Sequence, residues 1–232
     1  MSELSLLAIT ALTLGAIHSF APDHLAAVSI FVTRRPGWRR ALSLGARWGL
    51  GHSLIIVLLG TALAVSGARL PDRFASAAER IVGMTLIVLG VIALWRAKRL
   101  HGHWHVHDGH RHWHLHAHRA DQKAAHAALH EESHRHEHKA LLGIGMLHGL
   151  AGTGALVVAL PVAASITMPR AVLFLTAFGV GTIVAMALFG AAAGWLMHGA
   201  SRLSSLLHRG AIAAAGLTSI AVGAWWLAAG GA

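Results

Sequence analysis

Long apolar runs alternate with short polar segments along most of this chain. Six of the runs are about as long as the 20 helical residues that cross a hydrocarbon core of about 30 Å. They cover residues 4–32, 41–66, 78–97, 140–164, 171–197 and 210–230. Unpaired backbone groups are too costly in lipid, and the runs are far longer than the strands of a membrane barrel. Each run is therefore predicted to be a transmembrane helix.

This pattern predicts an all-α, polytopic membrane protein of six transmembrane helices, built in three parts. Residues 1–97 hold the first three predicted spans, and residues 140–232 hold the last three. Between them, residues 98–139 form a polar segment that is rich in histidine. We expect this segment to be a flexible cytoplasmic loop.

The two sets of three spans show signs of an internal repeat. His18 and His148 lie 130 residues apart, and the same offset places Gly49 on Gly179. Repeats of three spans each have opposite orientations in the membrane, and transporters with such repeats bind their substrate near the midplane where the repeats meet. The sequence therefore predicts a 3+3 inverted repeat with a central site.

The loop charges predict how the chain is oriented. Lys and Arg are concentrated after the first, third and fifth predicted spans, whereas the loops on the other side hold few. By the positive-inside rule, the side rich in Lys and Arg is cytoplasmic, which leaves both termini outside. No Lys or Arg precedes the first run, so we expect a retained span instead of a cleaved signal. The predicted location is a bacterial-type inner (cytoplasmic) membrane.

Composition supports the lipid bilayer as the main partner. The chain is 55% hydrophobic and 12% charged, whereas soluble proteins contain about 25% charged residues. The formal net charge is +10, but the basic residues lie between apolar runs and not on a folded face that could read bases, so no nucleic-acid partner is expected. The absence of cysteine excludes disulfides, thiolate metal sites and iron–sulfur clusters.

The first apolar run carries three ionisable groups that hydrocarbon should reject: His18, Asp23 and His24. Each would cost about 3 kcal/mol near the middle of a membrane, so such groups mark a pathway or a binding site. Imidazole with a neighbouring carboxylate suits divalent transition metals. Pro22 lacks the N–H that would bond the carbonyl of His18, so we expect a break there that frees this carbonyl and reorients the three side chains.

Two further histidines fall near the middle of predicted spans. His52 lies in GLGHSLIIVLLG and His148 in GMLHGLAGTG. We predict that both complete or gate the metal site. The alternative, which also applies to His18, Asp23 and His24, is that these polar side chains only form hydrogen bonds between helices.

The polar segment holds fourteen of the twenty histidines, most of them at every second position up to His118 and then at every fourth. Its apolar content is too low for a core, so we expect no regular structure without metal, apart from a possible helix face formed by the last group. At neutral pH most imidazoles are unprotonated and can bind metal. The candidate accessory ligands are His101, His103, His105, His107, His110, His112, His114, His116, His118, His126, His130, His134 and His138.

The residues HSFAPDH, 18–24, have the form H-x4-D-H. This resembles the signature helix motif of the nickel/cobalt transporter family, and the resistance-type nickel/cobalt exporters have a similar histidine spacing. The exporters also have a histidine-rich loop between their third and fourth spans, and short urease-associated relatives have six spans. The resemblance implies Ni²⁺ or Co²⁺ as the transported substrate and His18, Asp23 and His24 as core ligands.

Two hypotheses of function follow, in addition to a rejected third. The first is a transporter of divalent metal ions. It would be a secondary transporter, because no ATP-binding G-x4-G-K-[ST] motif is present. The direction, uptake or efflux, is left open. The second is a membrane accessory protein that buffers or delivers nickel to a metalloenzyme such as urease, with a cytoplasmic metallochaperone as partner. An intramembrane metallohydrolase would need a general base, and H-E-x-x-H is missing. We therefore predict no enzyme activity and no prosthetic group.

Overall fold

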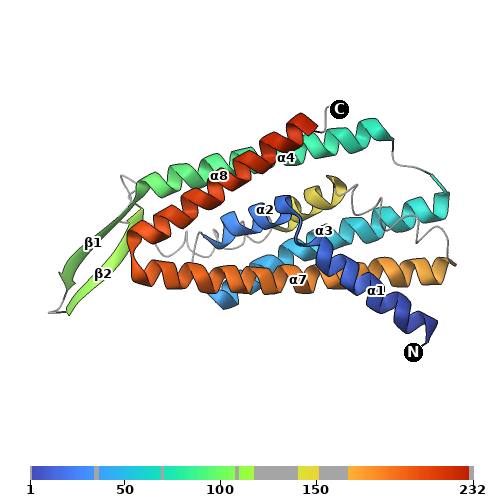
Figure 1. Cartoon of the computed structure of the whole chain (residues 1–232), viewed down its shortest axis with the longest axis horizontal. Coiled ribbons are helices and arrows are strands. Elements are labelled where there is room, and N and C mark those ends of the chain that lie inside the picture. Colours follow the sequence, from blue (N-terminus) through green and yellow to red (C-terminus); the bar gives the residue numbers. More distant parts are fainter. Residues whose placement is uncertain are drawn as a thin grey trace, which may run out of the picture.

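The computed structural model of the chain describes residues 2–33, 37–68, 71–107, 110–117, 141–151 and 167–229. Its labelled elements are α1 (Glu3–His18), α2 (Pro22–Val32), α3 (Trp38–Ser66), α4 (Asp72–Arg99), β1 (Leu100–His107), β2 (His110–Ala117), α7 (Met168–Leu203) and α8 (Ser205–Ala229). A further apolar helix covers Leu141–Ala151. The pairs α3–α7 and α4–α8 lie side by side, and α1 lies against α7 (Figure 1).

Local sequence explains where several helices begin and end. The Oγ of Ser2 caps α1 by accepting a hydrogen bond from the N–H of Ser5 at 3.2 Å, which satisfies a donor that the first turn leaves free. Pro22 occupies the first turn of α2, where its missing N–H costs nothing. Gly67 ends α3 with φ 64°, a left-handed conformation that glycine adopts without strain.

The predicted break in the first apolar run is confirmed. α1 and α2 meet at an angle of 65° across the three residues that precede Pro22. The prediction that the break frees the carbonyl of His18 is wrong, because this oxygen accepts a hydrogen bond from the N–H of Ala21 at 3.0 Å. The chain turns directly after α1, so a donor three residues on takes the place of the missing one.

The structure confirms a helical membrane protein. By length and composition, four helices are able to cross a membrane, α3, α4, α7 and α8, and the bent pair α1–α2 is a fifth candidate. Of the fourth predicted run, the structure describes the shorter helix Leu141–Ala151. The remaining residues of that run, 140 and 152–164, lie outside the described residues. These helices carry many large apolar side chains that are exposed, among them Leu58, Leu188, Trp195 and Trp225.

Residues 198–209, which separate the last two predicted runs, are almost entirely helical. α7 continues to Leu203 and α8 begins at Ser205, so that Ser204 alone separates them. Ser204 is extended, and its Oγ accepts a hydrogen bond from the N–H of Leu206 at 3.1 Å. This is the geometry of a helix cap. The polar residues 198–209 therefore extend both helices beyond the apolar runs, and Ser204 among them caps the start of α8.

Glycines let α3 and α7 approach backbone to backbone. A Cβ atom on Gly45 would overlap the carbonyl of Met186, and one on Gly190 would overlap the carbonyl of Ala41. These contacts also show that the two helices run antiparallel, because residue numbers rise along one helix as they fall along the other. Small residues of this kind permit close helix packing in membranes, where no hydrophobic force drives helices together.

The α4–α8 pair has the same design with reciprocal contacts. A Cβ atom on Gly83 would lie 2.9 Å from the carbonyl oxygen of Gly223, and one on Gly223 would lie 2.5 Å from that of Gly83. Gly90 and Gly216 face each other in the same way, at 2.5 and 2.9 Å. Each glycine therefore provides the space that its partner's backbone occupies.

Helix α1 packs on α7, whereas the helix Leu141–Ala151 packs on α3. Gly15 of α1 lies against the carbonyl of Phe178 in α7, whereas Gly145 lies against the carbonyl of Trp48 in α3. Residues from both predicted halves of the chain therefore share one packed interior.

Part of the histidine-rich segment is a hairpin. β1 and β2 pair antiparallel and project from one end of the helices (Figure 1). The prediction that this segment has no regular structure is therefore wrong for residues 100–107 and 110–117. The reason is in the sequence itself, since a histidine at every second position is the period of a strand. Residues 118–139, with the predicted helix face from His126 to His138, lie outside the described residues.

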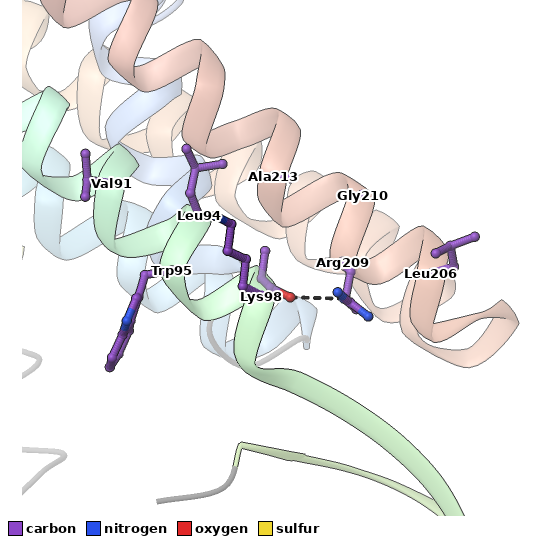
Figure 2. A pocket seen from close by; sticks show the side chains of 9 residues that line it. Val91, Leu94, Trp95, Lys98, Leu206, Arg209, Gly210 and Ala213 are labelled. Carbon is purple, nitrogen blue, oxygen red and sulfur yellow. Dashed lines mark hydrogen bonds between the residues drawn. The ribbon is translucent and has the colours of Figure 1, made fainter.

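A groove lies where the end of α4 meets the start of α8 (Figure 2). It has a volume of about 630 Å³ and is lined by apolar side chains together with Trp95, Lys98 and Arg209. The Nε of Arg209 donates a hydrogen bond to the carbonyl oxygen of Ala97 at 3.0 Å. The described residues that line the groove include no histidine, aspartate or glutamate, and the ligands that the sequence predicts in the membrane lie elsewhere.

Replacing Gly45 with alanine should destabilise the protein, because the added Cβ meets a carbonyl and forces α3 away from α7. Overpacking of this kind costs about 1–3 kcal/mol. The matched control is Gly199→Ala in α7, where nothing lies within 4 Å of the added atom and alanine is the better helix former. Thermal unfolding in detergent should show a lower midpoint for Gly45→Ala only. Equal midpoints for the two variants would mean that this contact is not tight.

Candidate metal site

Three of the predicted ligands meet in the interior of the protein. His18 ends α1, His24 lies near the start of α2, and His52 lies in the middle of α3. One ring nitrogen from each lies within 4.8 Å of the others. His24 and His52 are buried, at 2% and 0% exposure. The break between α1 and α2 makes this possible, because on one straight helix His18 and His24 would not share a face.

The spacing of these nitrogens fits one ion after a small adjustment. Imidazole nitrogens bind Zn²⁺ at about 2.0–2.1 Å, so two ligands of one ion lie at most about 4.2 Å apart. The Nε2 atoms of His18 and His52 are already 3.3 Å apart. A shift of under about 1 Å would bring all three nitrogens to bonding distance of a central ion.

Asp23 supports His24 from the other side of its ring. The Nδ1 of His24 donates a hydrogen bond to the Oδ2 of Asp23 at 2.8 Å, so that the Nε2 of the neutral ring carries the lone pair. This Nε2 is buried and has no hydrogen-bond partner within the described part of the chain. Metal-binding histidines usually donate their second N–H to a carboxylate, which fixes the tautomer and the ring orientation. The structure thus places Asp23 on a candidate ligand and not among the three clustered nitrogens.

His148 borders this cluster without belonging to it. It is 1% exposed, and its ring centroid lies 6.0 Å from that of His24. Its Nδ1 lies 3.1 Å from the carbonyl oxygen of Ile144, and donation to that oxygen leaves the lone pair on Nε2, which is buried without a partner in the described residues. His148 therefore has the same free nitrogen as His24 but is further from the other ligands.

The unpaired nitrogens need a physical explanation. A buried polar atom without a partner costs about 1–3 kcal/mol, and such atoms are few in native proteins. Here the Nε2 atoms of His24 and His148 and the Nδ1 of His52 are all buried and unpaired among the described residues, on rings that neighbour one another. Coordination of a divalent cation would satisfy ring nitrogens of this cluster, and transition metals that prefer imidazole fit best.

Trp48 is part of the site, and the sequence reasoning missed it. Its ring lies 4.9 Å from His24 and 5.2 Å from His52, almost parallel to the latter at 10°. A signal was available, because Trp48 lies one helical turn before His52, on the same face of α3. Phe178 plays a similar part on α7, with its ring 5.6 Å from His18.

The hairpin brings the histidines of the accessory loop into register. Eight of the thirteen candidate ligands occupy partner positions on β1 and β2, namely His101 with His116, His103 with His114, His105 with His112, and His107 with His110. Partner positions lie on the same face of a sheet. The other five candidates lie outside the described residues.

Comparison with known proteins places the chain in a membrane family. The family model described as "Cytochrome C biogenesis protein transmembrane region" matches residues 26–225. The chain belongs to this family. The urease accessory protein UreH of Bacillus sp. (strain TB-90) is 28% identical to it over 197 residues, which are 82% of this chain and 77% of that protein. No solved structure matches the chain.

This membership confirms two of the predictions. The family is one of transmembrane regions and the relative is an accessory protein, so the chain is a multi-pass membrane protein and not an enzyme. The present member of the family contains no cysteine. Its function therefore cannot depend on a thiol or a disulfide of its own.

Removal of the clustered histidines should lower the number of Co²⁺ ions bound per chain by one. We expect His24→Ala to abolish this site, and Asp23→Asn to weaken its affinity about 10- to 100-fold, because loss of a carboxylate that orients a ligand typically has that effect. His208→Ala is the control, since His208 is also buried but is not one of the clustered residues. Calorimetry and cobalt absorption of the purified protein measure the change. An unchanged stoichiometry in His24→Ala would rule out the cluster as a site.

Proposed function

We propose that this protein is a secondary transporter that moves Ni²⁺ or Co²⁺ through the membrane, with His18, His24 and His52 as its core ligands. The observation that carries the proposal is the cluster of imidazole nitrogens on membrane-type helices, in which His24 and His52 are buried and His18 is partly buried. Ionisable groups in such a place are rare unless they line a path or bind a substrate. The H-x4-D-H motif at residues 18–24 and the relative's name, which refers to urease, agree with nickel as a substrate.

The glycine contacts support the 3+3 inverted repeat that this transporter would use. The contact of Gly15 with Phe178 and that of Gly145 with Trp48 are related by an offset of 130 residues on both sides. The same offset relates two more backbone contacts, Gly181 with Leu12 and Gly51 with Leu142. A pseudo-two-fold axis would exchange the members of each pair. An ion site near such an axis can open to either side of the membrane by equivalent movements.

The distribution of charge supports the proposed orientation. α3 begins beside the end of α7, and α4 ends beside the start of α8. Basic residues gather at this end, which carries Arg39, Lys98, Arg202 and Arg209. In our proposal this end is cytoplasmic, as is the hairpin that follows α4, and both termini lie outside.

The proposed ligands would bind a divalent ion and still release it. In neutral form three histidines bring no charge, and Asp23 provides one negative charge next to the ion through its hydrogen bond to His24. Transport requires an ion to leave as well as to enter, and neutral imidazoles with a nearby carboxylate bind divalent ions less permanently than a cage of thiolates would. His148, at the edge of the cluster, would exchange with one of the three as the site opens.

The histidine hairpin would raise the local metal concentration at the cytoplasmic end. Its strands pair histidine with histidine at four positions, so that eight histidines lie in one short hairpin. Such a ladder can hold several ions and release them as imidazoles protonate. In this proposal it loads or buffers the transporter and does not form the pathway.

A second candidate function is metal delivery without transport, as an accessory to a metalloenzyme. The similarity to a urease accessory protein favours it. In that case the hairpin would be essential and the buried histidines dispensable, with a cytoplasmic metallochaperone as the partner. The two functions therefore predict opposite results when the two histidine groups are removed separately.

Accumulation of ⁶³Ni in cells that produce the protein should depend on the buried site. We expect His18→Ala and His24→Ala to abolish the difference from cells without the protein, because each removes a ligand that the others cannot replace. His208→Ala is the control at another buried histidine. The sign of the wild-type difference gives the direction, since uptake raises accumulation and export lowers it. Wild-type flux in both variants, at equal membrane levels, would contradict the proposed site.

Deletion of residues 101–138, with a short flexible linker in their place, should weaken flux at low metal concentration but not abolish it. The permeation ligands lie in the helices, and the loop acts only on the local concentration. The measurement is ⁶³Ni flux across a range of external or internal metal. Complete loss of ⁶³Ni accumulation in the deletion variant, with normal accumulation in the His24→Ala variant, would favour the accessory function.

A further inference from the structure

Two buried aromatic side chains enclose the histidine cluster from different helices. Trp48 of α3 is 0% exposed and Phe178 of α7 is 1% exposed. The ring of Trp48 lies 5.3 Å from that of His148, and the ring of Phe178 lies 5.6 Å from that of His18. Trp48 thus packs on His148, which borders the cluster, and Phe178 packs on His18, which belongs to it.

These two pairs occupy equivalent positions. The offset of 130 residues that relates Gly15 to Gly145 also relates His18 to His148 and Trp48 to Phe178. In each pair the histidine lies three residues after a glycine, and that glycine packs on the carbonyl of the aromatic residue. The aromatic side chain and the histidine therefore belong to one backbone-to-backbone contact in each half of the chain.

The two aromatic residues lie on opposite sides of the site along the helix axes. α3 and α7 are antiparallel, with Gly49 against Ile183 and Ser53 bonded to Gly179. Trp48 is therefore level with about residue 184 of α7, which is roughly 9 Å along the axis from Phe178 at 1.5 Å per residue. Trp48 lies toward the end of the pair that contains Trp38, and Phe178 toward the end that contains Met168.

We propose that Trp48 and Phe178 are the two barriers that close the metal site, Trp48 on the cytoplasmic side and Phe178 on the outer side. This inference rests on the proposed transport function. A hydrated divalent ion cannot pass an apolar ring packed against an imidazole, because the ion would lose its water without gaining ligands. Access from one side requires the ring and its histidine to separate, which moves α1 against α7 or the helix Leu141–Ala151 against α3.

The symmetry of the two pairs explains why one barrier can stay closed while the other opens. Each barrier is a contact between a long helix and a shorter segment, and the two contacts share no residue. Separation of His148 from Trp48 exposes the cluster to one side and leaves the contact between His18 and Phe178 in place. The ion is then released or bound on one side at a time, which alternating access requires.

The test is the access of a thiol reagent to the site from each side of the membrane. The native chain has no cysteine, so His52→Cys provides a single thiol between the two barriers. A charged, membrane-impermeant methanethiosulfonate reagent is applied to right-side-out and to inside-out vesicles without metal. We expect Trp48→Ala to raise the labelling rate at least tenfold from the cytoplasmic side only, and Phe178→Ala to do so from the outer side only.

Two sets of controls separate a lost barrier from a disturbed fold. Leu58→Ala and Leu188→Ala shorten apolar side chains on the same two helices at lipid-facing positions, at 59% and 61% exposure, and should leave both rates unchanged. Trp48→Phe and Phe178→Trp keep an aromatic ring and should restore slow labelling. Each variant is compared by its elution on size exclusion, so that an unfolded protein is recognised.

The outcomes distinguish this inference from the proposed function. Equal increases from both sides, or no increase in either variant, would overturn the barrier assignment even if the wild-type protein moves nickel. Side-specific labelling with no nickel flux in the wild type would reject transport and leave Trp48 and Phe178 as closures of a buried binding site. Labelling of Trp48→Ala from the outer side would reverse the assignment of sides and overturn the orientation with it.

Discussion

The close approach of helix backbones is the constraint on which the rest of this structure depends. Glycines at the contacts of α3 with α7 and of α4 with α8 allow carbonyl groups to occupy the space of a side chain. In lipid, packing of this kind replaces the hydrophobic force that holds soluble helices together. Gly15 holds α1 against α7, and Gly45 and Gly190 hold α3 against the same helix, which places His18 of α1 beside His52 of α3. A bulkier residue at one of these positions would separate the imidazoles as well as the helices.

The cluster that results is unfavourable unless something binds to it. The Nδ1 of His24 is hydrogen-bonded to Asp23, and the Nδ1 of His148 is hydrogen-bonded to the carbonyl of Ile144. The Nε2 of each histidine is buried and unpaired within the described residues. An interior built only for stability would replace these groups with apolar side chains at little cost. Their presence on membrane-type helices is therefore the strongest physical argument for a metal substrate.

Membership in the cytochrome c biogenesis transmembrane family describes the architecture more than the chemistry of this protein. The match covers residues 26–225, but the chain contains no cysteine, so its chemistry does not use a thiol of its own. The same kind of helical frame can support different chemistry, because function depends on the side chains placed in it. In the proposed function, the paired histidine positions of the hairpin and the histidine cluster of the helices both bind divalent metal ions.

The sequence by itself determined the membrane class, most of the helices, the break at Pro22 and the histidines that cluster, because apolar length and ionisable groups in apolar runs are local signals. It did not show that Asp23 would hold His24, that Trp48 would pack on His52, or that the chain would continue as helix to Leu203. Those features depend on which faces of separate helices meet. The sequence did not predict the hairpin in the polar segment either, although its alternation is local, because low apolar content is typical of segments without regular structure. Tertiary structure decided the geometry of the site, since only packed glycine contacts bring distant segments to within hydrogen-bonding range.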